Sequence, residues 1–261
     1  MHQHFDGFDD EQWDEFKWEA HLNEVEKKSE QLRKFIASDP KGNTPRWLTL
    51  LQESQSEDDA FEAYVEEELL MDEAYFPEDE DDWDDEDDDW DDEDFLFGLN
   101  GDGLMDQSED EDYDEFDEGE EWKSLSDEYM YTDYGSLEDL DAFYEAKEFA
   151  VDILKWAETV PVKQQSKDFQ DFVDETLKIG AKLAGGHSFG FEQEYIGANI
   201  AYSKKALASA NHALQLLQDL KKKSLFAKKE YLEFHSVLFE LRNDIGIYIQ
   251  ELRDQFRFGF E

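Results

Sequence analysis

The chain has 261 residues with 72 Asp or Glu against 24 Lys or Arg, a formal net charge of −48, and no cysteine. The lack of cysteine excludes disulfides, thiolate metal ligands and thiol nucleophiles. Residues 1–140 hold 53 acidic and 8 basic side chains, whereas residues 141–261 hold 19 and 16. General adaptation to salt would spread carboxylates over the whole surface, so we interpret the N-terminal half as a local polyanion.

The sequence indicates a soluble, cytoplasmic protein. Its first residues lack a basic segment followed by an apolar run, and no apolar stretch approaches the roughly 18 residues that span a bilayer. We therefore expect no membrane contact.

Residues 1–75 are predicted to form an N-terminal helical region. Apolar residues recur at three- and four-residue steps over residues 9–37, with acidic side chains early and basic ones late, which favours an amphipathic helix that complements its dipole. The residues expected to be buried include Trp13, Phe16, Trp18, Leu22 and Val25. The stretch SDPKGNTP ends this helix, and shorter helices are predicted over residues 46–54 and 57–72.

Residues 76–135 are predicted to be an acidic, aromatic-rich, disordered segment. Residues 78–94 read EDEDDWDDEDDDWDDED, which places 15 carboxylates in 17 positions beside Trp83 and Trp90. Repulsion among charges this close opposes compaction, and no helical or alternating period offers a face to bury.

Two interpretations of this acidic arm stay open. It is either a solvating linker that keeps the protein soluble, or a polyanion that imitates nucleic acid. In the second case its carboxylates occupy the basic groove of a partner protein, and Trp83, Trp90, Phe95 and Phe97 add the apolar contacts.

Residues 136–258 are predicted to form an up-down four-helix bundle, which makes the fold class all-α. Ser136 is expected to cap the first helix, which ends near Glu158 before Pro161. The other helices are predicted over residues 168–184, 191–221 and 226–256, with Gly185 and Gly186 as a left-handed stop after the second. The expected core includes Phe143, Ile153, Leu154, Phe169, Phe172, Leu177, Leu183, Ile196, Ile200, Leu217, Phe234, Val237, Leu238, Leu241, Ile245 and Leu252.

Three motifs of this bundle match a known family in sequence and spacing. FAVDILKWAETVP at residues 149–161 is followed by IGAKLAGG at residues 179–186 and by EYI at residues 194–196. Over residues 143–256 the chain resembles the small bacterial four-helix-bundle proteins encoded in ribosomal RNA intervening sequences, and the accessory variability determinants of diversity-generating retroelements. Gly180, Lys182 and Gly185 depart from the family, which usually has Pro, Asn and Glu there.

The resemblance implies a fold, a ring-like homo-oligomer and, in the retroelement branch, contact with nucleic acid or a reverse transcriptase through a basic surface. The family has no established catalytic residues to carry over. The basic cluster of this bundle comprises Lys221, Lys222, Lys223, Lys228 and Lys229, at the turn between the third and fourth predicted helices. It could contact phosphate, complement a helix dipole, or be masked by the acidic arm.

Residues 98–109 partly match a calcium-binding loop. Asn100, Asp102, Leu104, Asp106 and Glu109 would take the ligand positions, but Gly98 stands where the first Asp belongs. A chance match within an Asp-rich segment is the competing interpretation, so calcium is a possible ligand and no other cofactor is expected.

No nucleophile with a base, phosphate loop or dinucleotide fingerprint occurs in the sequence. We therefore expect a non-enzymatic interaction protein whose acidic arm binds a basic protein, and a nucleic-acid-binding protein is one class of such a partner. The alternative is a nucleic-acid-binding accessory factor that acts through the lysine cluster, and a third possibility is a calcium-binding protein.

Overall fold

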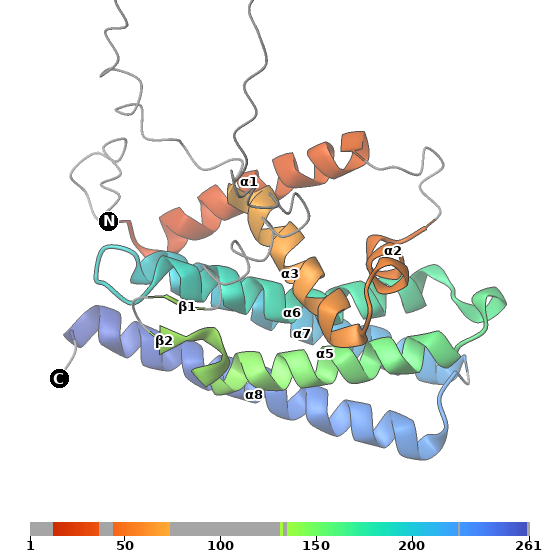
Figure 1. The fold of residues 1–261 in the computed structure, drawn as a ribbon. Helices are drawn as coiled ribbons and strands as arrows, with labels where there is room; N and C mark the ends of the chain where they lie inside the picture. The colour runs from red at the N-terminus through yellow and green to blue at the C-terminus, as the bar shows by residue number, and fades with distance from the viewer. Residues whose placement is uncertain (1–12, 37–43, 74–130, 133–134, 224, 260–261) are drawn as a thin grey trace, which may run out of the picture.

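Figure 1 shows the computed structural model of the chain, which describes residues 13–36, 44–73, 131–132, 135–223 and 225–259. Helices account for most of these residues, which confirms the all-α prediction. The elements are α1 (Glu15–Ile36), α2 (Arg46–Glu53), α3 (Glu57–Glu73), β1 (Tyr131–Thr132), β2 (Gly135–Ser136), η2 (Leu137–Asp139), α5 (Asp141–Thr159), η3 (Val162–Gln164), α6 (Lys167–Phe189), α7 (Ile196–Lys222) and α8 (Lys228–Phe258). Among the described residues, no helix is both long and apolar enough to cross a membrane.

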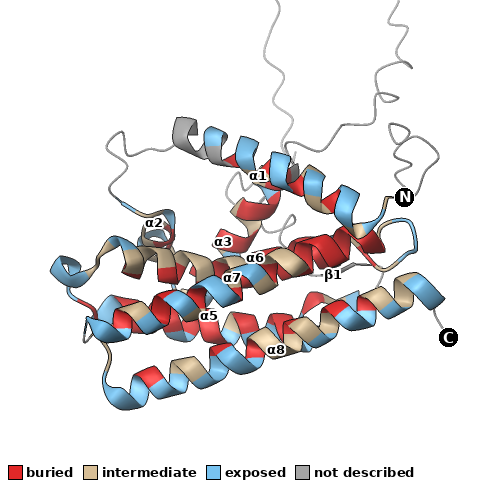
Figure 2. Cartoon of the chain, turned by 180° about the vertical axis from the view of Figure 1, so that it is seen from behind, coloured by how far each residue is buried: buried red, intermediate tan, exposed pale blue. Residues whose placement is uncertain are grey.

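The four long helices α5 to α8 pack side by side around a common core (Figure 1). Helix α5 contacts α6 and α8, and α7 contacts the same two helices. Buried residues gather on the facing sides of these helices, while much of the outer side of α8 is exposed (Figure 2). This follows from the apolar spacing in the sequence, since residues three and four apart share one helix face.

One end of the core is a cluster of aromatic rings. Trp156 of α5 stacks on Phe226, with ring centroids 4.5 Å apart and an interplanar angle of 12°. Phe172 of α6 and Phe234 of α8 meet the same rings edge-on. This cluster fixes the segment between α7 and α8 against the ends of α5 and α6.

The N-terminal helices pack on the long helices. Helix α3 contacts α5 and α6, while α1 contacts α7 and α3. Phe61 and Tyr64 of α3 are fully buried in the main core, where the ring of Phe61 lies 6.1 Å from that of Phe143. Trp47 of α2 is buried against Phe169 of α6, with ring centroids 6.2 Å apart.

The prediction that Gly185 and Gly186 end a helix is wrong. Helix α6 continues through both to Phe189 and ends at Gly190, whose φ of 84° is the left-handed conformation. The two glycines instead allow close approach between helices. A Cβ on Gly185 would lie 2.9 Å from a ring carbon of Tyr202, and one on Gly186 would lie 2.8 Å from the side chain of Asn199.

Other predicted details also differ. Phe16 is 65% exposed and Val237 is 38% exposed, although both were expected in the core. Val237 lies at the edge of the buried stripe of α8, whereas Phe16 lies on the side of α1 away from the buried Trp18, Leu22 and Val25. Ser136 caps the short η2 helix by accepting a hydrogen bond from the Glu138 backbone amide, and α5 begins only at Asp141.

Candidate interaction site

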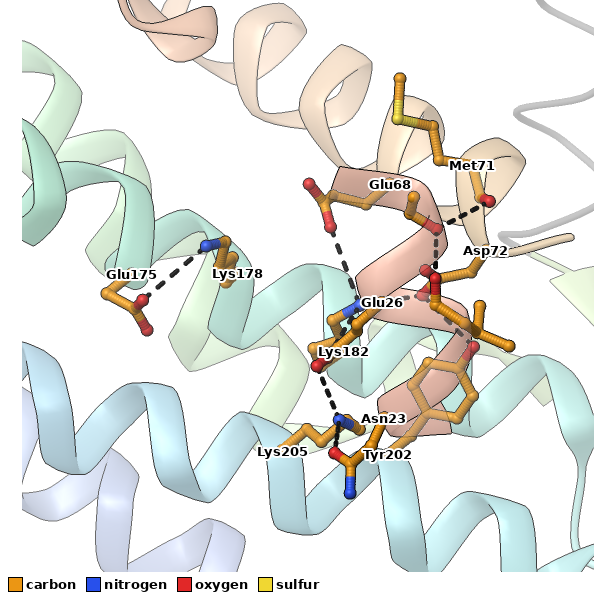
Figure 3. Close-up of polar contacts among 12 residues, drawn as sticks. Asn23, Glu26, Glu68, Met71, Asp72, Glu175, Lys178, Lys182, Tyr202 and Lys205 are labelled. Carbon is orange, nitrogen blue, oxygen red and sulfur yellow. Dashed lines mark hydrogen bonds and ion pairs between the residues drawn. The ribbon is translucent and has the colours of Figure 1, made fainter. Parts of the chain in front are cut away.

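A buried ion cluster joins α1, α3, α6 and α7 (Figure 3). Its centre is Lys182 of α6, whose Nζ lies 2.8 Å from an Asp72 oxygen and 3.7 Å from oxygens of Glu68 and Glu26. The side chains of Lys182, Glu68 and Asp72 are each 6% exposed. A lysine buried this deeply requires such partners, because an unpaired charge is costly in the protein interior.

The cluster controls the protonation of its members. Burial alone lowers the pKa of Lys182, but the nearby carboxylates of Asp72, Glu68 and Glu26 outweigh burial and raise it. The hydroxyl of Tyr202 donates to Asp72, the closest partner of Lys182, with 3.3 Å between the hydroxyl oxygen and Asp72 Oδ2. Burial, together with the Asp72 charge, raises the pKa of Tyr202, so this hydroxyl stays protonated and donating at neutral pH.

A further group of charges continues along α6. Lys178 Nζ lies 2.8 Å from Asp174 and 3.7 Å from Glu175. The Tyr64 hydroxyl of α3 donates to Asp174 at 2.9 Å. Burial lowers the pKa of Lys178, but Asp174 and Glu175 outweigh burial and raise it. Polar contacts thus bind α3 to α6 along the side that faces α1.

Helix α1 presents an acidic row to the long helices, formed by Glu15, Glu19 and Glu26. Glu15 accepts two hydrogen bonds from the Arg253 guanidinium of α8, both at 2.8 Å. Glu19 pairs with Lys204 of α7. The three glutamates lie on one side of α1 because their positions are four and seven residues apart on a helix.

The far end of the row meets Lys205 of α7. Its Nζ lies 2.8 Å from Glu26 and donates at 2.9 Å to Asn23. We call Lys182, Lys204, Lys205 and Arg253 the basic strip.

Hydrogen bonding by Arg253 holds the pKa of Glu15 below its usual value. Burial raises the pKa of Glu26, but Lys182 and Lys205 outweigh burial and lower it.

Beside the acidic row, α1 inserts an aromatic residue among small ones. Trp18 is 3% exposed and forms a cluster with Leu22, Ala198, Ala201 and Tyr202. A Cβ on Gly197 would lie 2.7 Å from the Trp13 carbonyl oxygen and 2.9 Å from a ring carbon of Trp18. The start of α7 therefore accommodates a tryptophan of α1 because its residues are small.

The predicted lysine cluster lies where α7 ends and α8 begins, but it is partly neutralised. Lys222 pairs with Asp219 at 2.6 Å. Lys223 bonds to both Ser166 and Asp168, which places the start of α6 beside this turn. The ammonium of Lys221 lies 4.0 Å from the centroid of the Tyr231 ring.

The remaining two lysines of the cluster, Lys228 and Lys229, lie exposed in the first turn of α8. The residue that the sequence did not reveal here is Asp168. It lies more than fifty positions away along the chain, and only the packing of α6 brings it to Lys223.

Two predicted sites lie outside the described residues. These are the aromatic residues of the acidic arm (Trp83, Trp90, Phe95 and Phe97) and the calcium loop (Asn100, Asp102, Leu104, Asp106 and Glu109). Within the described ranges, no group of three or more His, Asp or Glu side chains is arranged to hold a metal ion.

The basic strip and acidic row were missed from the sequence. Glu15 and Glu19 were interpreted only as matching a helix dipole, and Lys182 only as a departure from a family. One available signal was the acidic stripe at positions 15, 19 and 26, which flanks the apolar stripe of Trp18 and Leu22 on a helical projection.

Comparison of the chain with protein-family models, with curated proteins and with solved structures found no match.

Proposed function

We propose that this protein is a non-enzymatic interaction protein in which an up-down four-helix bundle, α5 to α8, carries an acidic aromatic arm over residues 76–135. The arm binds a basic, partly apolar surface of a partner protein. The observation that carries this proposal is the docking of α1 on the basic strip. There, an acidic and tryptophan-bearing segment of this chain lies on lysine, arginine and small apolar residues.

The arm has the same two chemical components as α1. Its carboxylates correspond to Glu15 and Glu19, and its Trp83 and Trp90 correspond to Trp18. Charge alone gives long-range attraction that salt screens, whereas buried tryptophan gives contact energy that salt does not screen. A solubilising tail would need only the first component, so the tryptophans favour a binding role.

The partner class follows from the spacing of charge. Carboxylates repeated along a chain can occupy the groove in which a nucleic-acid-binding protein holds phosphates, so the arm would compete with nucleic acid for that groove. The resemblance of residues 143–256 to the small bacterial bundle proteins agrees with a cytoplasmic homo-oligomer that presents several arms at once, which would increase avidity.

The proposal is tested by separating charge from aromatic contact in the full chain. The double variant Trp83→Ser, Trp90→Ser keeps every carboxylate. Its binding to two labelled peptides, one with lysine alone and one with lysine and leucine, is measured by fluorescence anisotropy at several salt concentrations. We expect about tenfold weaker binding of the lysine-leucine peptide and unchanged binding of the lysine-only peptide.

The matched control is Trp156→Phe, which changes a tryptophan of the bundle core and leaves the arm intact. Equal affinity of the wild-type chain and the double variant for both peptides, with equal salt dependence, would show that the arm is only a solvating segment.

A second candidate function is nucleic-acid binding through the lysine cluster, favoured by the exposure of Lys228 and Lys229 in the first turn of α8. A gel shift with the triple variant Lys221→Glu, Lys222→Glu, Lys223→Glu tests it. Loss of DNA or RNA binding in this variant would support the second function, and no binding by the wild-type chain would contradict it.

A further inference from the structure

Helix α1 packs outside the main hydrophobic core. The apolar cluster that Trp18 and Leu22 form with Ala198, Ala201 and Tyr202 is distinct from the main hydrophobic core. The main core is built from α2, α3 and the four long helices. Removing α1 would therefore open a peripheral cluster and leave the main core packed.

Helix α3 differs from α1 in this respect. Phe61, Tyr64 and Leu69 belong to the main core, so α3 cannot leave without opening it. The buried Lys182 would also keep its closest partner, Asp72 of α3, if α1 departed. Loss of α1 would therefore remove the Glu26 carboxylate from the ion cluster and leave Lys182 paired with carboxylates of α3.

Helix α1 is held by a buried apolar face, formed by Trp18, Leu22 and Val25, and by ion pairs at a partly wet rim. Glu19 and Glu26 are 38% and 39% exposed, and the side chain of Arg253 is 27% exposed. Ion pairs with this exposure weaken as salt rises. The electrostatic part of the attachment of α1 is therefore sensitive to ionic strength.

The surface beneath α1 is nevertheless specific in shape. Gly197 lacks the Cβ that would collide with Trp13 and Trp18, and the side chains of Ala198 and Ala201 are small. Beside them, Lys204, Lys205 and Arg253 pair with glutamates of α1. We call this surface beneath α1 the docking groove, which is formed by Gly197, Ala198, Ala201, Lys204, Lys205 and Arg253. Its shape and charge fit a helix that carries a tryptophan and a row of carboxylates.

We propose that α1 is a displaceable cover over a docking groove, and that the groove binds an acidic, tryptophan-bearing helix of a partner protein in place of α1. The charge complementarity between the basic strip and the acidic row carries this assignment. It concerns the basic face of α7 and α8 rather than the acidic arm. Both proposals start from the docking of α1 on the basic strip, but the tests below leave the arm unchanged, so their failure and that of the function proposed above are distinguishable.

Amide hydrogen exchange of the wild-type chain gives the first test. If α1 is a cover, its amides exchange through a local opening, at least about tenfold faster than those of the buried part of α6, and the difference grows with salt. If α1 and α6 exchange at the same rate at every salt concentration, α1 opens only when the whole protein unfolds and the proposal is overturned.

Binding in trans gives the second test. The probe is a fluorescent peptide of residues 13–29, and the protein is the full chain with Glu15→Gln, Glu19→Gln and Glu26→Gln. These changes weaken the cover and leave every groove residue native. We expect the peptide to bind this variant about tenfold more tightly than the wild-type chain, whose own α1 competes at high effective concentration.

Two controls fix the binding site. The same peptide with Glu15, Glu19 and Glu26 replaced by glutamine should lose most of its affinity. Adding Gly197→Val to the triple variant should abolish binding, because a side chain there would occupy the place of the tryptophan. Circular dichroism identifies any variant that has lost its fold.

The remaining outcomes overturn the proposal. No binding to a folded triple variant would exclude a groove that accepts a second helix. Binding that persists with Gly197→Val would place the peptide elsewhere. Formation of dimers by α1 exchange, detected by light scattering at the protein concentration used, would make a second copy the occupant instead of a partner protein.

Discussion

Lys182 and Asp72 form a buried ion pair between residues 110 positions apart, with 2.8 Å between Nζ and Oδ2. Each side chain is 6% exposed, and Asp72 also accepts a hydrogen bond from Tyr202. The pair links the end of α3 to the middle of α6. It therefore ties the last turn before the acidic arm to the long helices.

Replacing Lys182 with methionine should strongly destabilise the protein. The substitution keeps much of the side-chain volume but leaves Asp72 and Glu68 buried without their cation. We expect the free energy of unfolding, measured by urea denaturation, to fall by about 3 to 5 kcal/mol. Lys167→Met is the matched control, because this lysine is 83% exposed in its pair with Asp171 and its replacement should leave the urea midpoint nearly unchanged. Equal effects of the two substitutions would contradict a structural role for the buried pair.

The glycine of α6 that faces α3 should not tolerate a methyl group. A Cβ on Gly180 would lie 2.5 Å from Cζ of Phe61, whose ring is fully buried. We expect Gly180→Ala to lower the unfolding free energy by about 1 to 3 kcal/mol, because the ring must move within a packed core.

Gly246→Ala provides the control for this substitution, since a Cβ there meets no atom within 4 Å. The control should instead stabilise α8 by about 0.5 to 1 kcal/mol through helix propensity. Thermal unfolding of the two variants should thus shift in opposite directions. A stabilised Gly180→Ala variant would mean that α3 is not packed against α6 in solution.

His187 should make stability depend on pH near neutrality. Burial lowers its pKa from 6.5, although the Asp139 charge acts in the opposite direction. The unfolded chain therefore takes up a proton at this residue at a higher pH than the folded chain does. Above pH 6.5 His187 is neutral in both the folded and the unfolded chain, so it does not lower the free energy of unfolding. As pH falls from 6.5 toward the lower pKa of the folded chain, the unfolded chain is protonated first and stability is lost.

The measurement is the urea midpoint between pH 8 and pH 5 for the wild-type chain and for His187→Leu. The substitution should flatten this part of the profile. A wild-type profile that is already flat in this interval would refute the role of His187.

The acidic row should make the protein sensitive to stronger acid. Hydrogen bonding by Arg253 lowers the pKa of Glu15 from 4.5. The pKa of Glu15 is lower in the folded chain than in the unfolded chain. The stabilisation by its pair with Arg253 is therefore present above pH 4.5 and is lost as pH falls through the pKa of the folded chain. The unfolding free energy of the wild-type chain should therefore fall below pH 4.5 more steeply than that of Glu15→Gln. Parallel curves for the two proteins would show that the pair with Arg253 contributes nothing in solution.

The sequence alone determined the class of the fold and most of its helices. Apolar spacing located α2, α3 and α5 to α8, and it identified core residues such as Phe169, Leu177 and Ile245, because helix periodicity is a local property of the chain. The prediction of a helix end at Gly185 and Gly186 was wrong, because these glycines instead allow α6 and α7 to approach closely. A sequence shows that a side chain is missing but not which neighbour requires its absence.

Only the tertiary structure decided how the parts are joined and where the charges meet. The pairs Lys182 with Asp72, Glu15 with Arg253, and Lys223 with Asp168 connect residues 110, 238 and 55 positions apart. Ion pairing has no period along the chain, so nothing in the spacing of acidic and basic residues selects one partner among many. The packing of α1 and α3 on the long helices makes that selection, because burial leaves each of these charges within reach of only a few others.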